Sequence, residues 1–421
     1  MQQKTTLLFT NALKIVIALL LSSTCLLVTA QHTGDSSATD TTKPKIIKRL
    51  TDKDIIDVLH HWSHKDSHPH AAERQIKANK YNLSFVPAVG YTLQTGFAGI
   101  ASVNVGYYND EGPNAKISSL STSITYSQYN QVIVPLFVDI WSKGEKYNLV
   151  SDNRFISYPS DIYGLGGRTD PNRGHTIDFN SIKLHETFLI KLTKNLYGGV
   201  GIYYDQFWNI KAINPNTRRI DSIIQRELGN KEFAVGPTVK LLYDSRTNQI
   251  NPDKGTFFNV VFRNSSDFFG SDANWSSVVI DARTYFPFPR RSKNTFAFWS
   301  YNWLTAHGNP PYLLLPSTGW DDQYNTGRGY IQSRFRGKQM VYLESEYRFR
   351  VTHNGLIGGV VFLNMQNFSG ELSQTYDAIL PGYGLGIRVK LNKHSGANLC
   401  LDYGFGNNGS GGFYVNLGEV F

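Results

Sequence analysis

Charged side chains at every second position are the residues of this sequence best placed to do chemistry. The segment MVYLESEYRFRV carries four of them in this spacing: Glu344, Glu346, Arg348 and Arg350. Successive side chains of a β-strand point to opposite faces, so these charges share one face and the other face is apolar. Such carboxylates could work as acid and base or form ion pairs with arginines. A soluble sheet would turn the charges to water, whereas a membrane barrel would turn them to its lumen.

A single arginine in a tight loop is the second candidate for a functional residue. Arg328 stands between Gly327 and Gly329, and Tyr330 closes the turn. The two glycines permit a backbone path that other residues resist. The arginine is therefore expected either as a buried ion-pairing group or, alternatively, as an exposed loop residue that contributes little.

A histidine-rich stretch lies before the charged strand and the arginine loop in the sequence. HHWSHKDSHPH contains His60, His61, His64, His68 and His70. The i, i+4 spacing of His60 and His64 could hold zinc or nickel. No cysteine or carboxylate-bearing helix completes such a site, so a His-rich tether is favoured and neither a metal nor a cofactor is expected.

Motifs of the common enzyme classes are missing from the sequence. It contains neither the Gly-x-Ser-x-Gly elbow of hydrolases nor the HExxH motif of metalloproteases. The basic charge of +9 is spread along the chain, and no nucleic-acid-binding motif accompanies it. We therefore expect a protein that is not an enzyme and does not bind nucleic acid.

The N-terminus predicts export. Residues 1–30 have the pattern of a signal peptide, with Lys4 and Lys14 before an apolar stretch and small residues ending at Ala30. Residues 31–80 are expected to form a short periplasmic segment, polar and disordered at first. An amphipathic helix follows over 52–80, with Thr51 or Asp52 as its N-cap. After cleavage Cys400 is the only cysteine, so no disulfide is expected within the chain.

From Tyr81 onward the pattern is that of strands and turns. Tyr (24), Phe (25) and Gly (37) are abundant and Met (3) is rare. Period-two segments are predicted at 81–90, 93–109, 117–128, 131–141, 146–158, 175–192, 196–211, 232–244, 256–266, 274–286, 294–304, 339–351, 356–367, 382–391, 396–404 and 412–421. Most are longer than soluble strands and long enough to span a bilayer.

Charges recur on one face of several of these strands. In 274–286, Asp281 and Arg283 oppose apolar residues, and in 382–391, Arg388 and Lys390 do the same. Short and long connections also alternate, as in bacterial membrane barrels. The sequence therefore predicts an all-β fold over 81–421. This fold is a transmembrane antiparallel β-barrel of about sixteen strands in the outer membrane, with the long connections outside the cell.

Four motifs in order resemble one family. Gly327-Arg328-Gly329-Tyr330, between the eleventh and twelfth strands, resembles an invading-loop motif. YDSRTNQINPDKGTFF (243–258) resembles the turn before a ninth strand, GGVVFLNMQNFSG (358–370) a thirteenth strand, and FYVNLGEVF (413–421) a closing strand. Together they resemble the BamA/TamA superfamily of outer-membrane assembly and secretion barrels, also called the bacterial surface antigen family. The similarity is strong over 230–421 and diffuse over 81–230.

The resemblance implies a site. The loop arginine of the family folds into the lumen, so Arg328 is expected to meet Glu346 and Asn364, with Tyr330 and Phe362 beside them. In the family an aspartate usually stands where this chain has Asn364, which removes one charged partner. Breaking a buried ion pair of this kind costs about 3–5 kcal/mol.

Further implications concern the two ends of the chain. The C-terminal residues Phe413, Val415, Leu417, Gly418 and Phe421 resemble the signal that barrel-assembly machinery reads. A weak seam is expected between strands 81–90 and 412–421, where Pro87 and Gly90 would interrupt hydrogen bonding. Residues 31–80 are too few for a periplasmic POTRA domain and a tether, so the chain resembles the branch of the superfamily that lacks these domains.

Two functions are compatible with the predicted barrel and its family resemblance. The first is assembly, insertion or translocation of protein or lipid at the outer membrane, in contact with outer-membrane lipid. The assembly machinery would be a partner during biogenesis, and a periplasmic partner protein is an open possibility. The alternative is a passive or gated diffusion pore, because barrels near sixteen strands can enclose a channel.

Overall fold

The computed structural model describes most of the predicted barrel. The described residues are 52–55, 57, 81–110, 116–214, 220–370, 376, 378–393 and 395–421. The expected signal peptide, the segment 31–50, the histidine-rich stretch and most of the expected helix at 52–80 lie outside them. No helix in this described part is long and apolar enough to cross a membrane.

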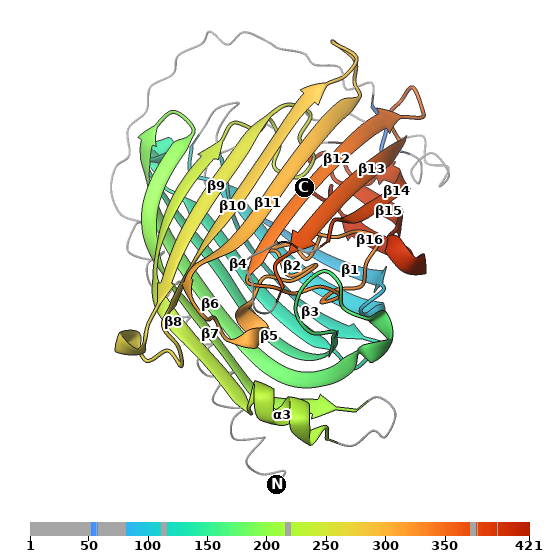
Figure 1. The fold of residues 1–421 in the computed structure, drawn as a ribbon. Helices are drawn as coiled ribbons and strands as arrows, with labels where there is room; N and C mark the ends of the chain where they lie inside the picture. Colours follow the sequence, from blue (N-terminus) through green and yellow to red (C-terminus); the bar gives the residue numbers. More distant parts are fainter. Residues whose placement is uncertain are drawn as a thin grey trace. The chain divides into compact units, whose positions relative to one another are not determined.

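One antiparallel sheet of 16 strands forms the structure, and its strands follow one another in chain order (Figure 1). The strands are β1 (Asn82–Thr92), β2 (Gly96–Tyr108), β3 (Ile117–Ser127), β4 (Val132–Trp141), β5 (Tyr147–Ile162), β6 (His175–Thr193), β7 (Leu196–Ile213), β8 (Lys231–Asp244), β9 (Gly255–Ser265), β10 (Trp275–Pro287), β11 (Thr295–Gly308), β12 (Gln339–Arg350), β13 (Ile357–Phe368), β14 (Leu380–Lys390), β15 (Asn398–Phe405) and β16 (Gly411–Leu417). Each overlaps one predicted segment. The predicted all-β barrel fold is therefore confirmed.

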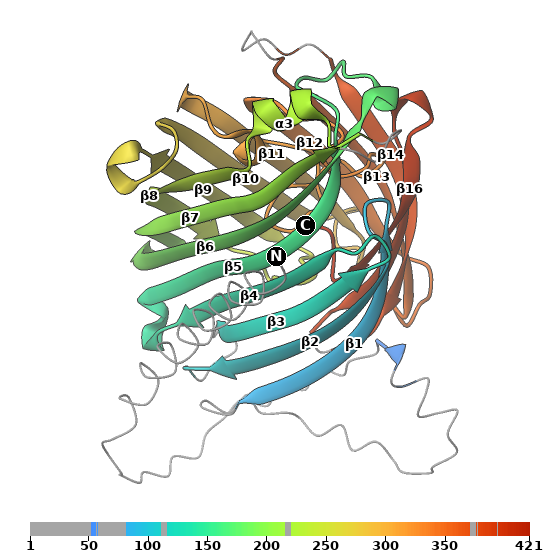
Figure 2. The same cartoon turned by 90° about the horizontal axis from the view of Figure 1, so that it is seen from below.

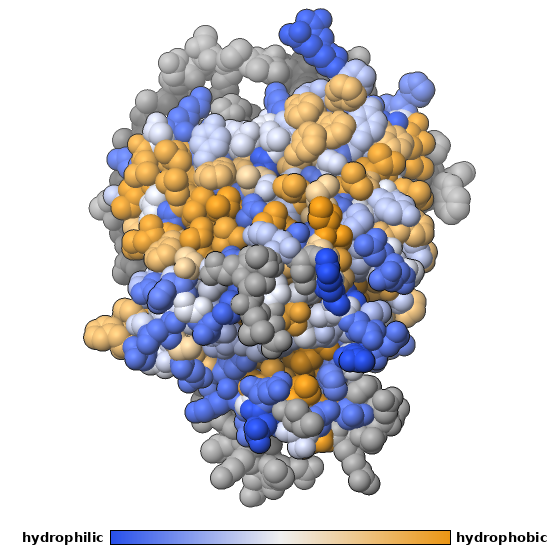
Figure 3. All heavy atoms as spheres, in the orientation of Figure 1, coloured by the Kyte–Doolittle hydropathy of each residue, from blue (hydrophilic) through white to orange (hydrophobic). Residues whose placement is uncertain are grey.

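The two faces of each strand differ as the sequence predicts. In β12, Leu343 is 44% exposed and the neighbouring Glu344 is 3% exposed. Most charged residues of β10, β12 and β14 are buried inside, and most of the large outward side chains are apolar. Figure 3 shows these outward side chains as a hydrophobic belt across the half of the face that lies away from helix α3 (Ser222–Leu228). Such a belt suits contact with lipid.

Strand β5 extends further than predicted, past a proline that was expected to end it. Pro159 lacks an N–H and was expected to begin a loop, but β5 continues to Ile162. The pairing of β4 with β5 ends at Ser157, so Pro159 has a partner strand, β6, on one side only. Proline is tolerated at such an edge. Its carbonyl accepts hydrogen bonds from the side chains of Gln94 and Gln131.

The connections define two rims. The turn rim carries the short connections, including 194–195, 351–356 and 391–397; the loop rim carries the long ones, including 163–174 and 309–338. Seen from below in Figure 2, the first and last strands, β1 and β16, lie next to each other. In the described part of the chain no hydrogen-bonded ladder joins them. The expected seam is therefore an interruption of the sheet.

A short N-terminal segment lies against the turn rim. Asp52 pairs bidentately with Arg350 at 2.9 and 2.8 Å, and the Lys393 amine donates to Asp57. The sequence predicted Thr51 or Asp52 as the N-cap of the helix in this segment, and that prediction is wrong. Asp54 accepts from the Asp57 amide and Asp57 accepts from the Asp54 amide, both at 3.0 Å, which is the reciprocal pattern of a capping box.

Candidate functional site

The connection between β11 and β12 enters the barrel and crosses it. On one side Leu313 and Leu314 pack with the cluster that contains Tyr158 and Phe179 of β5 and β6. On the other side Tyr330 and Phe335 pack with a cluster from β11, β12 and β13. We call residues 309–338 the invading loop. It bridges two opposite sets of wall strands.

Two glycines bring the loop backbone close to the wall. Gly327 and Gly329 have φ angles of 81° and 108°, in the left-handed region that favours glycine. A Cβ on Gly329 would lie 2.5 Å from the carbonyl oxygen of Phe405 in β15. Any larger residue there would push the loop away from β15, so the tight turn positions the Arg328 side chain.

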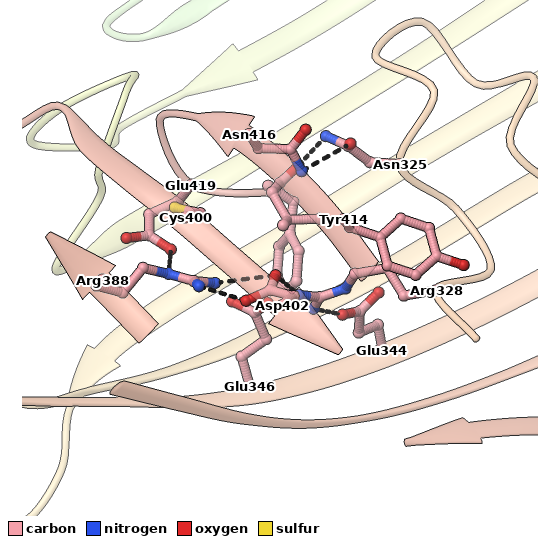
Figure 4. A network of polar contacts seen from close by, with 12 residues as sticks. Asn325, Arg328, Glu344, Glu346, Arg388, Cys400, Asp402, Tyr414, Asn416 and Glu419 are labelled. Carbon is pink, nitrogen blue, oxygen red and sulfur yellow. Dashed lines mark hydrogen bonds and ion pairs between the residues drawn. The ribbon is translucent and has the colours of Figure 1, made fainter. Parts of the chain in front are cut away.

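The guanidinium of Arg328 is surrounded by carboxylates (Figure 4). It donates to Glu344 and Glu346 of β12 and, at 2.6 Å, to Asp402 of β15. Its carbon lies 3.7 Å from the centroid of the Phe362 ring in β13, a cation–π distance. Arg328 is 1% exposed. Ion pairs this deeply buried are stabilising only when each charge has a partner.

Further arginines balance the carboxylates. Arg348 donates to Glu346 at 2.6 Å, and Arg388 donates to Asp402 and, at 2.8 Å, to Glu419. The hydroxyl of Tyr342 also donates to Glu344. We call the set Arg328, Glu344, Glu346, Arg348, Arg388, Asp402 and Glu419 the lumen charge cluster. It joins the invading loop to β12, β14, β15 and the residues after β16.

The structure brings the residues predicted for the site together, in partly different roles. Glu346 and Phe362 contact the Arg328 guanidinium as described. Asn364 was expected to accept from the guanidinium, but its Nδ2 donates to the Arg328 backbone carbonyl at 2.9 Å. Tyr330 lies beyond the guanidinium, where its hydroxyl donates to the Pro381 carbonyl at 2.6 Å.

Sequence reasoning missed Glu344, Asp402 and Tyr414 as partners of the loop. The signal for Glu344 was present, because it lies two residues before Glu346 on the same strand face. Asp402 could be predicted to face inward, but its distance from residue 328 in the sequence hid the contact. The Tyr414 hydroxyl accepts from the Gly329 amide at 2.9 Å and donates to the Tyr330 carbonyl at 2.8 Å.

The C-terminal residues divide between the two faces. Phe413 and Leu417 are exposed on the outside and Val415 is partly exposed. The last strand was predicted to reach Phe421, but it ends at Leu417. Gly418, with φ of 90°, then redirects the chain.

Residues 418–421, here called the tail, end inside the barrel. The Phe421 ring stacks on Trp299 with centroids 5.1 Å apart, and Arg348 donates to the Phe421 carbonyl at 2.9 Å. The terminal aromatic residue is therefore part of the interior and does not face outward.

The seam is asymmetric. Tyr414 ties β16 to the invading loop, and the Asn325 side chain donates to the Val420 carbonyl of the tail at 2.7 Å. β1 pairs with β2 along its whole length, and its described side chains make no hydrogen bond or ion pair with the invading loop. Phe85 and Val89 of β1 are exposed. One edge of the seam, β16, is anchored to the invading loop, whereas the other, β1, has a hydrogen-bonded ladder only with β2 among the described strands.

No chemistry beyond charge pairing emerges from these groups. Each carboxylate of the lumen charge cluster is paired with an arginine, which suits a structural latch. In the described part of the chain no group of three or more His, Cys, Asp or Glu could hold a metal ion.

Comparisons with known proteins agree with this architecture. The model of the Omp85 superfamily domain matches residues 116–421. BamA from Haemophilus ducreyi, solved without POTRA domains 1–3, is 14% identical with a TM-score of 0.50, covering 82% of this chain and 75% of that chain. CdiB from Acinetobacter baumannii is 14% identical with a TM-score of 0.51, covering 81% of this chain and 60% of that chain.

A third structure is similar to the same degree. CdiB from Escherichia coli is 12% identical with a TM-score of 0.53, covering 81% of this chain and 68% of that chain. Likeness at this level of identity shows the fold. A search of curated proteins gives no match to the sequence.

Proposed function

This chain belongs to the Omp85 superfamily, and from that premise we propose that it inserts or translocates protein or lipid at the outer membrane through the seam between β1 and β16. Its partners would be outer-membrane lipid, the barrel-assembly machinery during biogenesis, and a periplasmic protein that delivers the client.

The asymmetric seam is the observation that carries the proposal. An unpaired strand edge offers N–H and C=O groups that can pair with an incoming strand. β16 is anchored to the invading loop through Tyr414, so its edge stays in place. No described hydrogen bond or ion pair joins β1 to the invading loop, and the turn after β1 is held only by the hydrogen bonds of Gln94 with Pro159 and Gln131. The seam is therefore suited to open on the β1 side.

The invading loop argues against the alternative, a diffusion pore. The invading loop packs on both walls, and the lumen charge cluster and the tail occupy the space beside β12–β16. A solute that passes beside β12–β16 would have to displace buried ion pairs. Single-channel recording of the purified protein tests this. Steady conductance that persists with the invading loop intact would support a pore and contradict the proposal.

A disulfide across the seam tests the proposal directly. A Cβ built on Gly412 of β16 would lie 2.5 Å from Cγ of Leu93, which follows β1. Cysteines at these two positions could therefore approach disulfide geometry. We expect Leu93→Cys/Gly412→Cys to fold but to fail, when oxidised, to complement depletion of the wild-type protein. Added reductant should restore complementation.

A matched control places the same bond within the sheet. Leu401 of β15 and Val415 of β16 are directly opposed, so a disulfide between cysteines at those positions does not cross the seam. This variant should complement under both conditions. Full complementation by the oxidised seam variant, once its disulfide is shown to have formed, would contradict the proposal.

The effect of depleting the protein distinguishes an assembly or translocation barrel from a pore. Depletion of an assembly or translocation barrel should lower the levels of particular outer-membrane proteins or lipids. Depletion of a pore should change only the uptake of small solutes.

A further inference from the structure

Four segments enclose a pocket of about 450 Å³ at the loop rim. They are the β5–β6 loop (163–174), the invading loop, residues 378–380 at the start of β14, and the β15–β16 loop. The volume falls in the range of ligand sites, about 300–1,000 Å³. None of the contacts that form the lumen charge cluster uses this space, so the pocket is separate from the latch.

A buried arginine forms one wall. Arg334 of the invading loop is 8% exposed, and its guanidinium carbon lies 4.8 Å from the Tyr163 ring centroid and 4.4 Å from that of Phe335. Two of its N–H groups donate to Thr169, one to Oγ1 and one to the carbonyl, both at 2.6 Å. An arginine has five N–H donors, so donors are left for a ligand.

No carboxylate neutralises this arginine in the described part of the chain. The nearby Asp170 forms its ion pair with Arg173 instead, at 3.5 Å. Burial lowers the pKa of Arg334, against the smaller opposing influence of Tyr163, Asp170 and Tyr330. A buried cation without an anion is costly. An anion bound in the pocket would remove that cost.

The other residues that line the pocket suit a ligand that has a ring with polar groups at its edges. Exposed Arg168 adds a second cation, and Asn407 and Asn408 bring amide groups. Ile331 and Ile379 supply apolar surface. None of the described lining residues is acidic. Thr169 occupies one N–H of Nη1 and one of Nη2, so the N–H groups left for a ligand are that of Nε and the second one on each Nη. Arginine binds carboxylate and phosphate with such groups.

We propose that this pocket binds an anionic sugar of one or two rings, through a phosphate or carboxylate group held by Arg334. The sugar could be free in solution or could be the headgroup of a glycolipid. This function is distinct from traffic through the seam.

Titration calorimetry of the purified barrel in detergent micelles tests the proposal. The soluble probes are glucose 6-phosphate, glucuronate and neutral glucose; the lipid probes are diphosphoryl lipid A and its dephosphorylated form in mixed micelles. At least one anionic probe should bind ten or more times more tightly than its neutral counterpart. A preference among the soluble probes would point to a free sugar, and a preference confined to lipid A would point to a glycolipid. No preference in either pair would overturn the proposal.

Two variants tie binding to the pocket. Arg334→Gln removes the charge and should weaken binding of the anionic probe at least tenfold, as expected for a lost hydrogen bond to a charged group. Asn408→Asp adds a negative charge at an exposed lining residue without touching Arg334 and should also weaken binding. Because Asn408 is exposed, this variant keeps the test valid if Arg334→Gln fails to fold.

A control variant removes a cation elsewhere. Lys143→Gln changes an exposed residue at the turn rim and should leave binding unchanged. Equal weakening by Lys143→Gln would show that general charge attraction governs binding, and would refute a role for the pocket. Unchanged binding in a folded Arg334→Gln or Asn408→Asp variant would refute it as well.

Discussion

Arg328 and Asp402 form an ion pair at 2.6 Å across 74 residues of sequence. The pair joins the invading loop to β15, near the end of the chain. Asp402 also accepts from Arg388, so one carboxylate connects the loop to β14 as well. Loss of the loop arginine therefore disturbs more than one contact.

Arg328→Ala should lower the stability of the folded barrel. It leaves Glu344, Glu346 and Asp402 buried with less positive charge, which typically costs about 3–5 kcal/mol. The temperature at which the folded form disappears in heat-modifiability gels measures the effect. Arg328→Ala/Glu344→Gln should recover part of the loss. Arg173→Ala, at a side chain that is 85% exposed, serves as the control. An unshifted transition in Arg328→Ala would contradict the latch.

Asn364→Asp should destabilise this chain, although the family usually has aspartate there. The amide Nδ2 donates to the Arg328 carbonyl, and a carboxylate cannot donate in its place. It would also bring another negative charge to the lumen charge cluster. Losing a buried hydrogen bond of this kind costs about 1–3 kcal/mol. Denaturant unfolding in detergent is the measurement. A variant as stable as the wild type would mean that the Asn364 bond contributes nothing.

Phe421→Ala should destabilise the folded barrel more than Phe413→Ala does. The Phe421 ring is buried against Trp299, and removal of a buried phenylalanine ring costs about 3–5 kcal/mol. Phe413 is exposed on the outer face, so its loss opens no cavity. Thermal unfolding of both purified variants in the same detergent makes the comparison. Equal transitions would show that the tail does not contribute to the folded state.

The N-terminal segment should detach from the turn rim in acid. The hydrogen bond with Arg350 lowers the pKa of Asp52, against the opposing effect of burial and with help from the positive charges of Arg350, Lys293 and Lys390. An aspartate with a lowered pKa stabilises the folded contact at pH values above its ordinary value of 3.8. That stabilisation is lost as the pH falls through the lowered pKa.

A fluorophore on Ile55→Cys provides the measurement, since the other described cysteine, Cys400, is buried. Its anisotropy should stay constant at pH values above 3.8 and fall as the pH is lowered further, through the lowered pKa of Asp52. Asp52→Asn should show low anisotropy already at pH 7, and Asp267→Asn at the loop rim should behave as wild type. A signal that does not depend on pH in the wild type would rule out this anchor.

Local pattern was enough to predict the strands, because each strand carries its own two-faced alternation. Leu343 and Glu344 show it in neighbouring positions. The same reasoning failed at Pro159, where the outcome depends on which neighbouring strand is still present. It failed again at Phe421, where interior contacts with Trp299 redirect a segment whose own pattern continues a strand.

The site was predictable only as far as the family resemblance reached. Glu346 and Phe362 followed from the motif, whereas Asp402 and Tyr414 lie far from the loop in sequence and come close only because the loop folds into the barrel. Asn364 shows a further limit. Its identity is visible in the sequence, but whether its amide donates or accepts depends on where the Arg328 carbonyl points.

The invading loop has a mechanical consequence. It connects two opposite walls as a brace, so the barrel cross-section resists distortion at β5–β6 and at β12–β15. The brace also holds β16 through Tyr414. A force that widens the barrel would act on the place where no hydrogen-bonded ladder joins neighbouring strands in the described part of the chain, between β1 and β16. Lateral stress in the surrounding bilayer would thus meet a wall that the loop supports from within on two sides.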